Sequence, residues 1–126
     1  MTVDKILTAL SVGPSHPLPK QQKAVVALGA GQLIVAQDAP VPVLQPDMIL
    51  VKIAAIYLNP VDIKALDYSH AQGIIMGYDF SGTMVALGED EEKSRYFTVG
   101  DRVTGVVQGM SKEQPDVGAS AETWPP

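Results

Sequence analysis

The residues with the most chemical potential lie in one block, Asn59-Pro60-Val61-Asp62-Ile63-Lys64, directly after a predicted strand. A strand that stops at a proline and passes into a helical turn brings backbone amides and short polar side chains to one edge, where a ligand can meet them. The simpler interpretation is that Asn59 caps a short helix which Pro60 begins. Lys64 follows Asp62 by two positions, so the two do not share a helix face, and an isolated lysine is usually a solvated charge. Local physics alone leaves both interpretations open.

Cysteine and histidine chemistry is almost absent from this sequence. The 126 residues include no cysteine, which excludes a disulfide, a thiolate nucleophile and a cysteine-ligated zinc. The two histidines, His16 and His70, do not have metal-ligand spacing. We therefore expect no metal site and no zinc.

Charge and hydropathy restrict the partners. Nine Lys and Arg residues oppose 14 Asp and Glu residues, giving a net charge of −5 with no basic stripe, so we expect no nucleic-acid partner. The longest apolar runs, such as Ile53–Leu58, are too short to cross a membrane, and the N-terminus does not resemble a signal peptide. We expect a soluble cytoplasmic protein with no membrane partner. The acidic run Glu89–Glu92 is typical of a solvated loop.

The pattern of apolar residues and turn residues predicts a mainly β fold with short helices. Residues 1–22 are interpreted as an N-terminal extension, within which 1–10 would form a short helix or no regular structure, and residues 23–126 as one domain. Several short strands separated by glycine and proline turns favour a β-barrel or sandwich. The predicted strands are residues 23–28, 33–35, 48–57, 77–87 and 102–107, and a helical turn or two is predicted at 61–66.

The triplet Gly29-Ala30-Gly31 follows an apolar strand and resembles the start of a GxGxxG dinucleotide fingerprint. The third glycine position is Ile34, and Leu33-Ile34-Val35 favours a strand where the fingerprint requires a helix. We therefore predict a β-hairpin turn here and not a nucleotide site.

Two further blocks carry a family resemblance: Gly77-Tyr78-Asp79-Phe80-Ser81-Gly82 and Val99-Gly100-Asp101-Arg102-Val103. With the block at Asn59, their order resembles the N-terminal GroES-like domain of the medium-chain dehydrogenase/reductase superfamily. In the zinc enzymes of that superfamily the first of these blocks opens with Gly-His-Glu, whose histidine binds zinc. Here Tyr78 and Asp79 take those positions, and Asn59 stands near the position of a missing zinc-binding cysteine. The resemblance thus points to the zinc-free branch of quinone oxidoreductases and enoyl reductases.

Within that branch the chain looks most like fungal trans-acting enoyl reductases, which reduce an enoyl group with NADPH beside a polyketide synthase. Their Asn-Pro-Ser-Asp-x-Lys block matches Asn59 to Lys64, with Val61 in place of serine. The resemblance implies that Val61, Asp62, Ile63 and Lys64 contact NADPH and that Lys64 is catalytic. It places Asn59 and Tyr78 in the substrate cleft. The implied partner is the polyketide synthase or its acyl intermediate.

The resemblance ends near residue 122. The family continues into a Rossmann domain, and its Gly-Ala-Phe-x-x-Tyr segment and last strand are replaced here by Gly118-Ala119-Ser120-Ala121 and a proline-rich end. We therefore expect a GroES-like, partly open β-barrel that lacks the Rossmann domain and is truncated at its C-terminal end. An open barrel edge exposes unpaired backbone groups and an apolar stripe, so we expect a homo-oligomer or a partner at that edge.

Three functions remain open from the sequence. The first is the catalytic lobe of an NADPH-dependent enoyl reductase. The second is a non-catalytic β-domain that binds a partner or ligand. The third is a repurposed non-redox enzyme, an isomerase or cyclase that acts on a polyketide intermediate.

Overall fold

A computed structural model describes residues 6–8, 19–69 and 72–121 of the chain. The described elements are β1 (Ile6–Thr8), β2 (Gln21–Gly29), β3 (Gln32–Pro40), β4 (Ile49–Tyr57), α1 (Pro60–Tyr68), β5 (Ile74–Ile75), β6 (Asp79–Leu87), α2 (Glu89–Ser94) and β7 (Arg102–Val106).

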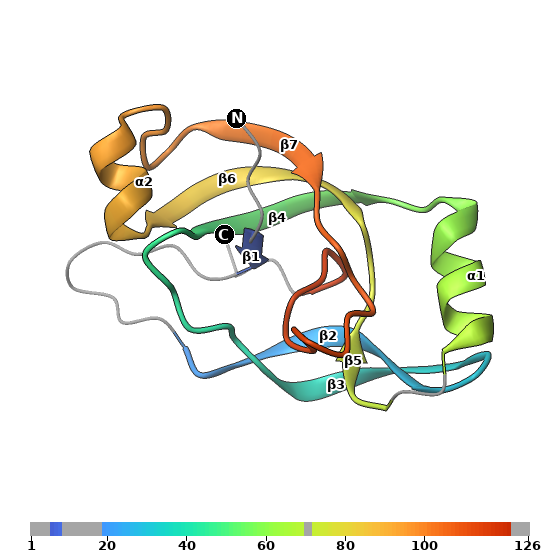
Figure 1. Ribbon diagram of the computed structural model, residues 1–126. Helices are drawn as coiled ribbons and strands as arrows, with labels where there is room; N and C mark the ends of the chain where they lie inside the picture. Colours follow the sequence, from blue (N-terminus) through green and yellow to red (C-terminus); the bar gives the residue numbers. More distant parts are fainter. Residues whose placement is uncertain (1–5, 9–18, 70–71, 122–126) are drawn as a thin grey trace.

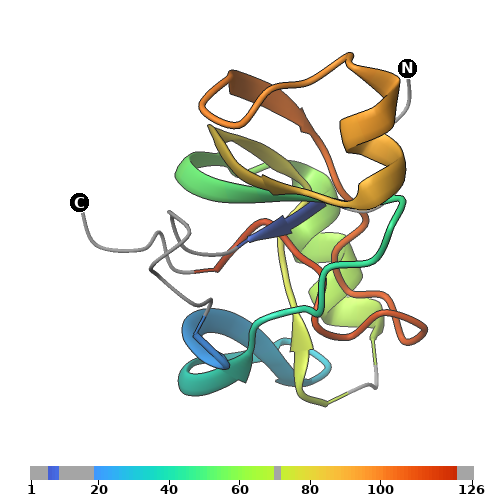
Figure 2. The same ribbon diagram turned by 90° about the vertical axis from the view of Figure 1, so that its left-hand side faces the viewer.

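The strands form two sheets that lie one above the other. One has the order β1-β4-β6-β7 and the other the order β3-β2-β5 (Figure 1). The view along the layers shows the two sheets stacked, with the chain after β7 returning through the space between them (Figure 2). Neither sheet closes on itself, so the prediction of a mainly β, partly open architecture with short helices is confirmed.

The predicted hairpin is confirmed. Strands β2 and β3 pair antiparallel, with Val26 opposite Ile34, around a turn at Ala30 and Gly31. The Gly31 N–H donates to the carbonyl oxygen of Leu66 at 3.0 Å, so the tip of the hairpin holds the C-terminal half of α1. The segment Gly29-Ala30-Gly31 therefore forms a hairpin turn that contacts the helix α1.

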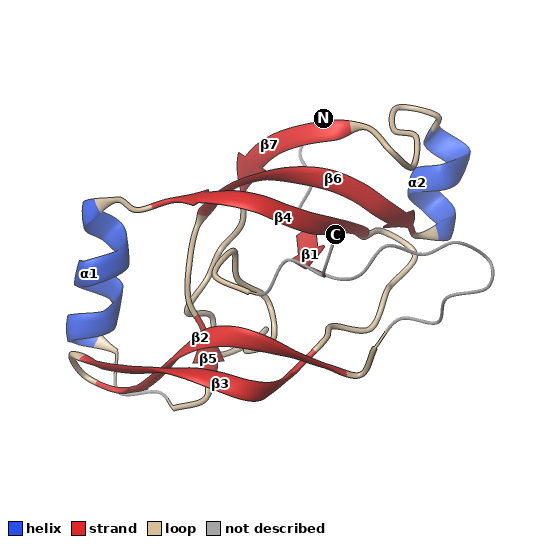
Figure 3. Ribbon diagram, turned by 180° about the vertical axis from the view of Figure 1, so that it is seen from behind, coloured by secondary structure: helices blue, strands red, loops and turns tan. Residues whose placement is uncertain are grey.

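Strand β4 leads from the core to the candidate site. Its first three residues, Ile49, Leu50 and Val51, are almost completely buried, because they lie between β6 and the space enclosed by the two sheets. Its last four residues, from Ala54 to Tyr57, are exposed. The N-terminal half of β4 is thus buried in the core, whereas its C-terminal end reaches the surface, where α1 follows it along the chain (Figure 3).

Strand β6 is packed tightly against β4. Gly82 pairs with Ile53, and a Cβ at Gly82 would collide with the backbone oxygen of Lys52. A glycine inside a strand is typical of such a close approach between backbones. The next buried residues of β6 are Phe80 and Met84, each 1% exposed, which fill the centre of the largest core cluster.

Two segments differ from the sequence-based prediction. Within residues 1–10, where a short helix or no regular structure was expected, Ile6–Thr8 is a strand that pairs parallel with β4. The acidic run is the helix α2 and not a loop. Its four acidic residues occupy the first turn, where the partial positive charge of the helix N-terminus stabilises carboxylates.

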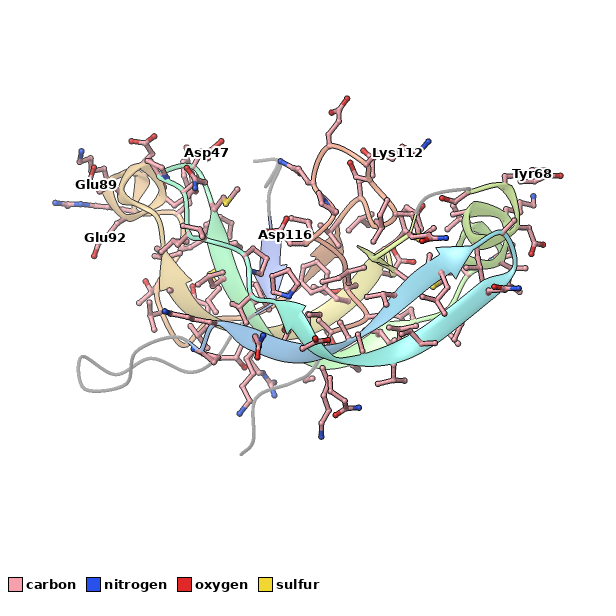
Figure 4. The ribbon with its side chains drawn as sticks, turned by 90° about the horizontal axis from the view of Figure 1, so that it is seen from below. Asp47, Tyr68, Glu89, Glu92, Lys112 and Asp116 are labelled. Carbon is pink, nitrogen blue, oxygen red and sulfur yellow. The ribbon has the colours of Figure 1, made fainter. Side chains whose placement is uncertain are left out.

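The two helices lie at opposite ends of the sheets (Figures 1 and 3). With side chains drawn, Glu89 and Glu92 mark the α2 end together with Asp47, and Tyr68 marks the α1 end (Figure 4). Neither helix in the described part of the chain is long and apolar enough to cross a membrane.

Candidate functional site

The start of α1 is built as its sequence predicts. Asn59 occupies the N-cap position in an extended conformation, and Pro60 is the first helical residue. The carboxylate of Asp62 accepts a hydrogen bond from the Asn59 backbone N–H at 2.8 Å, and the Asp62 N–H donates to the Asn59 carbonyl at 3.0 Å. Asp62 is only 5% exposed, so its charge serves the helix start and does not face solvent.

A second hydrogen bond ties this helix start to β6. The register of β4 against β6 places Tyr57 opposite Asp79, so Asn59, two residues further on, lies near the beginning of β6. The side-chain amide of Asn59 donates to the Asp79 carboxylate. Asn59 therefore links two carboxylates, one through its backbone and one through its side chain.

Tyr78 belongs to the same cluster. It precedes Asp79 and is half-buried, and its carbonyl accepts a hydrogen bond from the Val107 N–H at 2.8 Å. Burial raises the pKa of the Tyr78 phenol above the ordinary 10.0, and the negative charge of Asp62 raises that pKa further. The phenol is consequently a proton donor at neutral pH and not a phenolate.

The remaining predicted site residues point outward. Lys64 is exposed, and Val61 and Ile63 expose 43% and 66% of their surface. Val61 and Lys64 are three positions apart and share a helix face, whereas Asp62 lies on the buried face with Leu66. The structure thus brings Asn59, Asp62 and Tyr78 together and leaves Val61, Ile63 and Lys64 exposed on the adjoining helix.

This arrangement determines what the site can hold. No group of three or more Asp, Glu, His or Cys side chains in the described ranges is placed to bind a metal ion. The exposed side of α1 instead offers two apolar side chains, Val61 and Ile63, and one ammonium group, that of Lys64. Chemically, the site residues include one cation, Lys64 on α1, and one neutral phenol, Tyr78 before β6.

The sequence-based reasoning missed Asp79 as a site residue. Asp79 was recognised as part of a motif, but its partner Asn59 lies 20 residues earlier, and only the pairing of β4 with β6 brings the two together. The signal that could have identified it was the position of Asp79 in the block that holds a zinc ligand in other members of the superfamily.

A second feature is an apolar cavity between the two sheets, with a volume of about 440 Å³. One wall is formed by β2 and β3 and another by the last half of β4, and Ser120 and Ala121 lie at its border. Its lining is almost entirely aliphatic: Ala24, Val25, Val35, Ile53, Ala54, Ala55, Ile56 and Ala121, with Lys23 and Ser120. Ala121 forms a single antiparallel bridge with Ala24. Among the described residues, the second half of β4 pairs with β6 and with no second strand.

Comparisons with known proteins agree with the motifs. The family described as alcohol dehydrogenase GroES-like domain matches residues 45–122. A trans-enoyl reductase from Trichoderma harzianum is 58% identical over 105 residues, covering 83% of this chain and 28% of the relative. A trans-enoyl reductase from Aspergillus niger is 60% identical over 105 residues, which again cover 83% of this chain and 28% of the relative. The chain therefore spans about 28% of the length of these relatives.

The fold has a counterpart among solved structures. The quinone oxidoreductase from Coxiella burnetii matches with a TM-score of 0.64 and 29% identity, over 80% of this chain and 33% of that chain. The family match covers the strands β4, β6 and β7 together with α1, the elements that build the site. The chain belongs to the alcohol dehydrogenase GroES-like domain family of the medium-chain dehydrogenase/reductase superfamily, and it is similar in sequence to fungal trans-enoyl reductases.

Proposed function

We propose that this domain is the catalytic lobe of an NADPH-dependent, trans-acting enoyl reductase that works on the acyl intermediate of a polyketide synthase. The observation that carries the proposal is the edge formed by Val61, Ile63 and Lys64, which α1 presents to solvent beside the fixed cluster of Asn59, Asp62 and Tyr78. The trans-enoyl reductases from Trichoderma harzianum and Aspergillus niger support the substrate class.

In this proposal Lys64 stabilises charge in the substrate. NADPH, when bound, supplies the hydride. Addition of hydride at the β-carbon of an enoyl thioester moves negative charge to the thioester oxygen, and a cation or hydrogen-bond donor near that oxygen lowers the barrier. Lys64 is exposed and lies on the helix face it shares with Val61, so its ammonium group is free to reach a ligand at this edge. Asn59 and Tyr78 would line the substrate side of the same edge.

A domain replacement tests this function. The aligned segment of the Trichoderma harzianum relative, 58% identical, is replaced by the residues of this chain, and NADPH oxidation is followed with an enoyl thioester. We expect an active chimera that loses about 10²- to 10³-fold in kcat on Lys64→Ala and less on Lys64→Arg. Lys93→Ala is the matched control, because Lys93 is an exposed lysine on α2 at the opposite end of the fold. Equal activity of Lys64→Ala and Lys93→Ala would overturn the role of Lys64.

Titration of NADPH into this chain alone, followed by cofactor fluorescence, asks whether the α1 edge is sufficient for binding. Saturable binding that weakens on Lys64→Ala supports the proposal. Turnover of the acyl substrate without oxidation of NADPH would instead favour the non-redox isomerase or cyclase.

A second role, as a partner-binding domain, is favoured by the cavity between the sheets. An aliphatic wall of this kind gains free energy when it is covered, and we propose that a second copy of the chain covers it. Size-exclusion chromatography with light scattering should detect a dimer that Ala55→Glu disrupts, since Ala55 is exposed and lines the cavity. A monomer at high concentration would contradict self-association.

A further inference from the structure

We propose that Asp79 is a positioning residue, which acts through Asn59 to hold the first turn of α1 and thereby sets the place of Lys64. The inference rests on the proposed function, because it assigns a role in orienting the residue that the proposed reaction uses. It goes beyond that function because the contact between Asn59 and Asp79 lies outside the exposed residues Val61, Ile63 and Lys64.

The first step of the argument is that Asn59 is held from two directions. Its backbone N–H donates to Asp62, which fixes the cap to its own helix. Its side-chain amide donates to Asp79, which fixes the cap to a different element, β6. A hydrogen bond between a neutral amide and a carboxylate is among the stronger kinds, particularly where water is partly excluded. Both carboxylates are at least half-buried.

The second step is that α1 has few other attachments to the sheets. At its C-terminal half, the Leu66 carbonyl accepts the Gly31 N–H of the hairpin, and the Leu66 side chain is 8% exposed against Ala27 and Met76. At its start, the side chain of the N-cap residue Asn59 contacts Asp79 of β6. Lys64 lies between these two attachments. Removal of the Asp79 contact therefore leaves the helix docked at its C-terminal half and loosens its start, which then depends on the end of β4 and on the buried Asp62.

The third step concerns the choice of residue types. Asparagine can donate from its amide while its backbone N–H serves the helix, so one residue meets both carboxylates. An aspartate at position 59 would place a carboxylate against that of Asp79, which is repulsive. An asparagine at position 79 would keep an acceptor oxygen without the charge. These two isosteric changes therefore separate an effect of geometry from an effect of charge.

The first test measures the anchor without cofactor or substrate. In this chain, amide hydrogen exchange is followed by NMR across residues 61–66 for wild type, Asp79→Ala, Asp79→Asn and Asn59→Asp. We expect faster exchange in Asp79→Ala and Asn59→Asp and near wild-type exchange in Asp79→Asn. Asp101→Ala is the matched control, since the Asp101 carboxylate likewise accepts a hydrogen bond, in this case from the Thr98 backbone N–H at 3.0 Å, in an exposed turn remote in sequence from α1. Unchanged exchange in Asp79→Ala would overturn the proposal.

The second test asks whether the anchor acts through Lys64. In the active chimera, Asp79→Ala should lower kcat/KM about tenfold to hundredfold, a size typical of a displaced catalytic group, with Asp79→Asn recovering most of the loss. In the Lys64→Ala background, Asp79→Ala should cost nothing further, because the group that it positions is already absent. An undiminished loss in that background would overturn positioning through Lys64. A Lys64→Ala chimera as active as wild type would instead overturn the catalytic role of Lys64, and an inactive wild-type chimera would overturn the proposed function, so the failures are distinguishable.

Discussion

Gly77 opens the strongest family motif, and replacing it by alanine should destabilise the domain far more than a surface glycine does. Gly77 is buried and has a φ of +100°, a conformation that residues with a side chain rarely adopt. A Cβ at this position would lie 2.5 Å from the Ser120 Oγ and 2.6 Å from the Ser120 backbone nitrogen. The added methyl group must therefore push the 117–121 segment away from β5 and β6.

The cost can be divided into strain and lost contacts. The positive φ costs a non-glycine residue about 1–2 kcal/mol. Displacement of Ser120 also endangers three backbone hydrogen bonds: Ser120 to Met76 at 2.9 Å, Ala119 to Gly77 at 3.2 Å and Val25 to Ser120 at 2.8 Å. At about 0.5–1.5 kcal/mol for each such bond, the packing part amounts to about 2–4 kcal/mol. Because small domains have a total stability of about 5–15 kcal/mol, the change approaches unfolding.

Gly100→Ala is the matched control. Gly100 has the same φ of +100°, but a Cβ there meets no atom within 4 Å. The difference between the two variants in the free energy of unfolding, measured by urea titration with circular dichroism, therefore isolates the packing of Ser120 against Gly77. We expect Gly77→Ala to lose about 2–4 kcal/mol more than Gly100→Ala, which shares the strain of the positive φ. Equal losses would refute the close packing of the 117–121 segment against the motif.

The other predictions concern the pH response and the core. The pKa of Tyr78 can be measured as the difference between the phenolate absorbance titrations of wild type and Tyr78→Phe. The midpoint of this difference curve should lie above pH 10.0, because burial and then the Asp62 charge raise the Tyr78 pKa. A midpoint below pH 10.0 would contradict the burial of Tyr78. The Tyr78 pKa is higher in the folded than in the unfolded state, so its contribution to stability is intact below pH 10.0 and is lost as the pH rises through the folded pKa. Above pH 10.0, wild type should therefore lose more stability than Tyr78→Phe. Phe80→Ala should lower the free energy of unfolding by about 3–5 kcal/mol, because the side chain is 1% exposed in the largest core cluster. Leu58→Ala, at an 80% exposed position, should change it by less than about 0.5 kcal/mol; similar effects at the two positions would contradict the assigned core.

The elements that could be predicted from sequence are those whose cause is local. The glycines around Ala30 predict a hairpin turn, and the strands on both sides are found where the β-favouring runs lie. The pair Asn59-Pro60 predicts the end of β4 and the start of α1, because the cap and the first helical position have distinct residue preferences.

The elements that could not be predicted depend on contacts distant in sequence. The parallel pairing of Ile6–Thr8 with β4 has no local signature, since it joins residues more than 40 positions apart. The contact of Asn59 with Asp79 follows from the register of β4 against β6, which local patterns do not determine. The helix α2 was missed for a different reason: a run of like charges suggested a solvated loop, although acidic residues are favourable in the first turn of a helix.

The structure also separates two kinds of residue within the family motifs. Gly77, Phe80 and Gly82 are explained by the fold, because each one packs where a different side chain would collide or leave a void. Their presence therefore supports family membership but gives no argument for present catalysis. Lys64 has no such explanation: it is exposed, while the helix that carries it is fixed at both ends by buried contacts. The contacts that fix this helix stabilise the fold, but they do not require a lysine at position 64, so activity must be tested at Lys64 and at the Asn59–Asp79 contact that holds its helix.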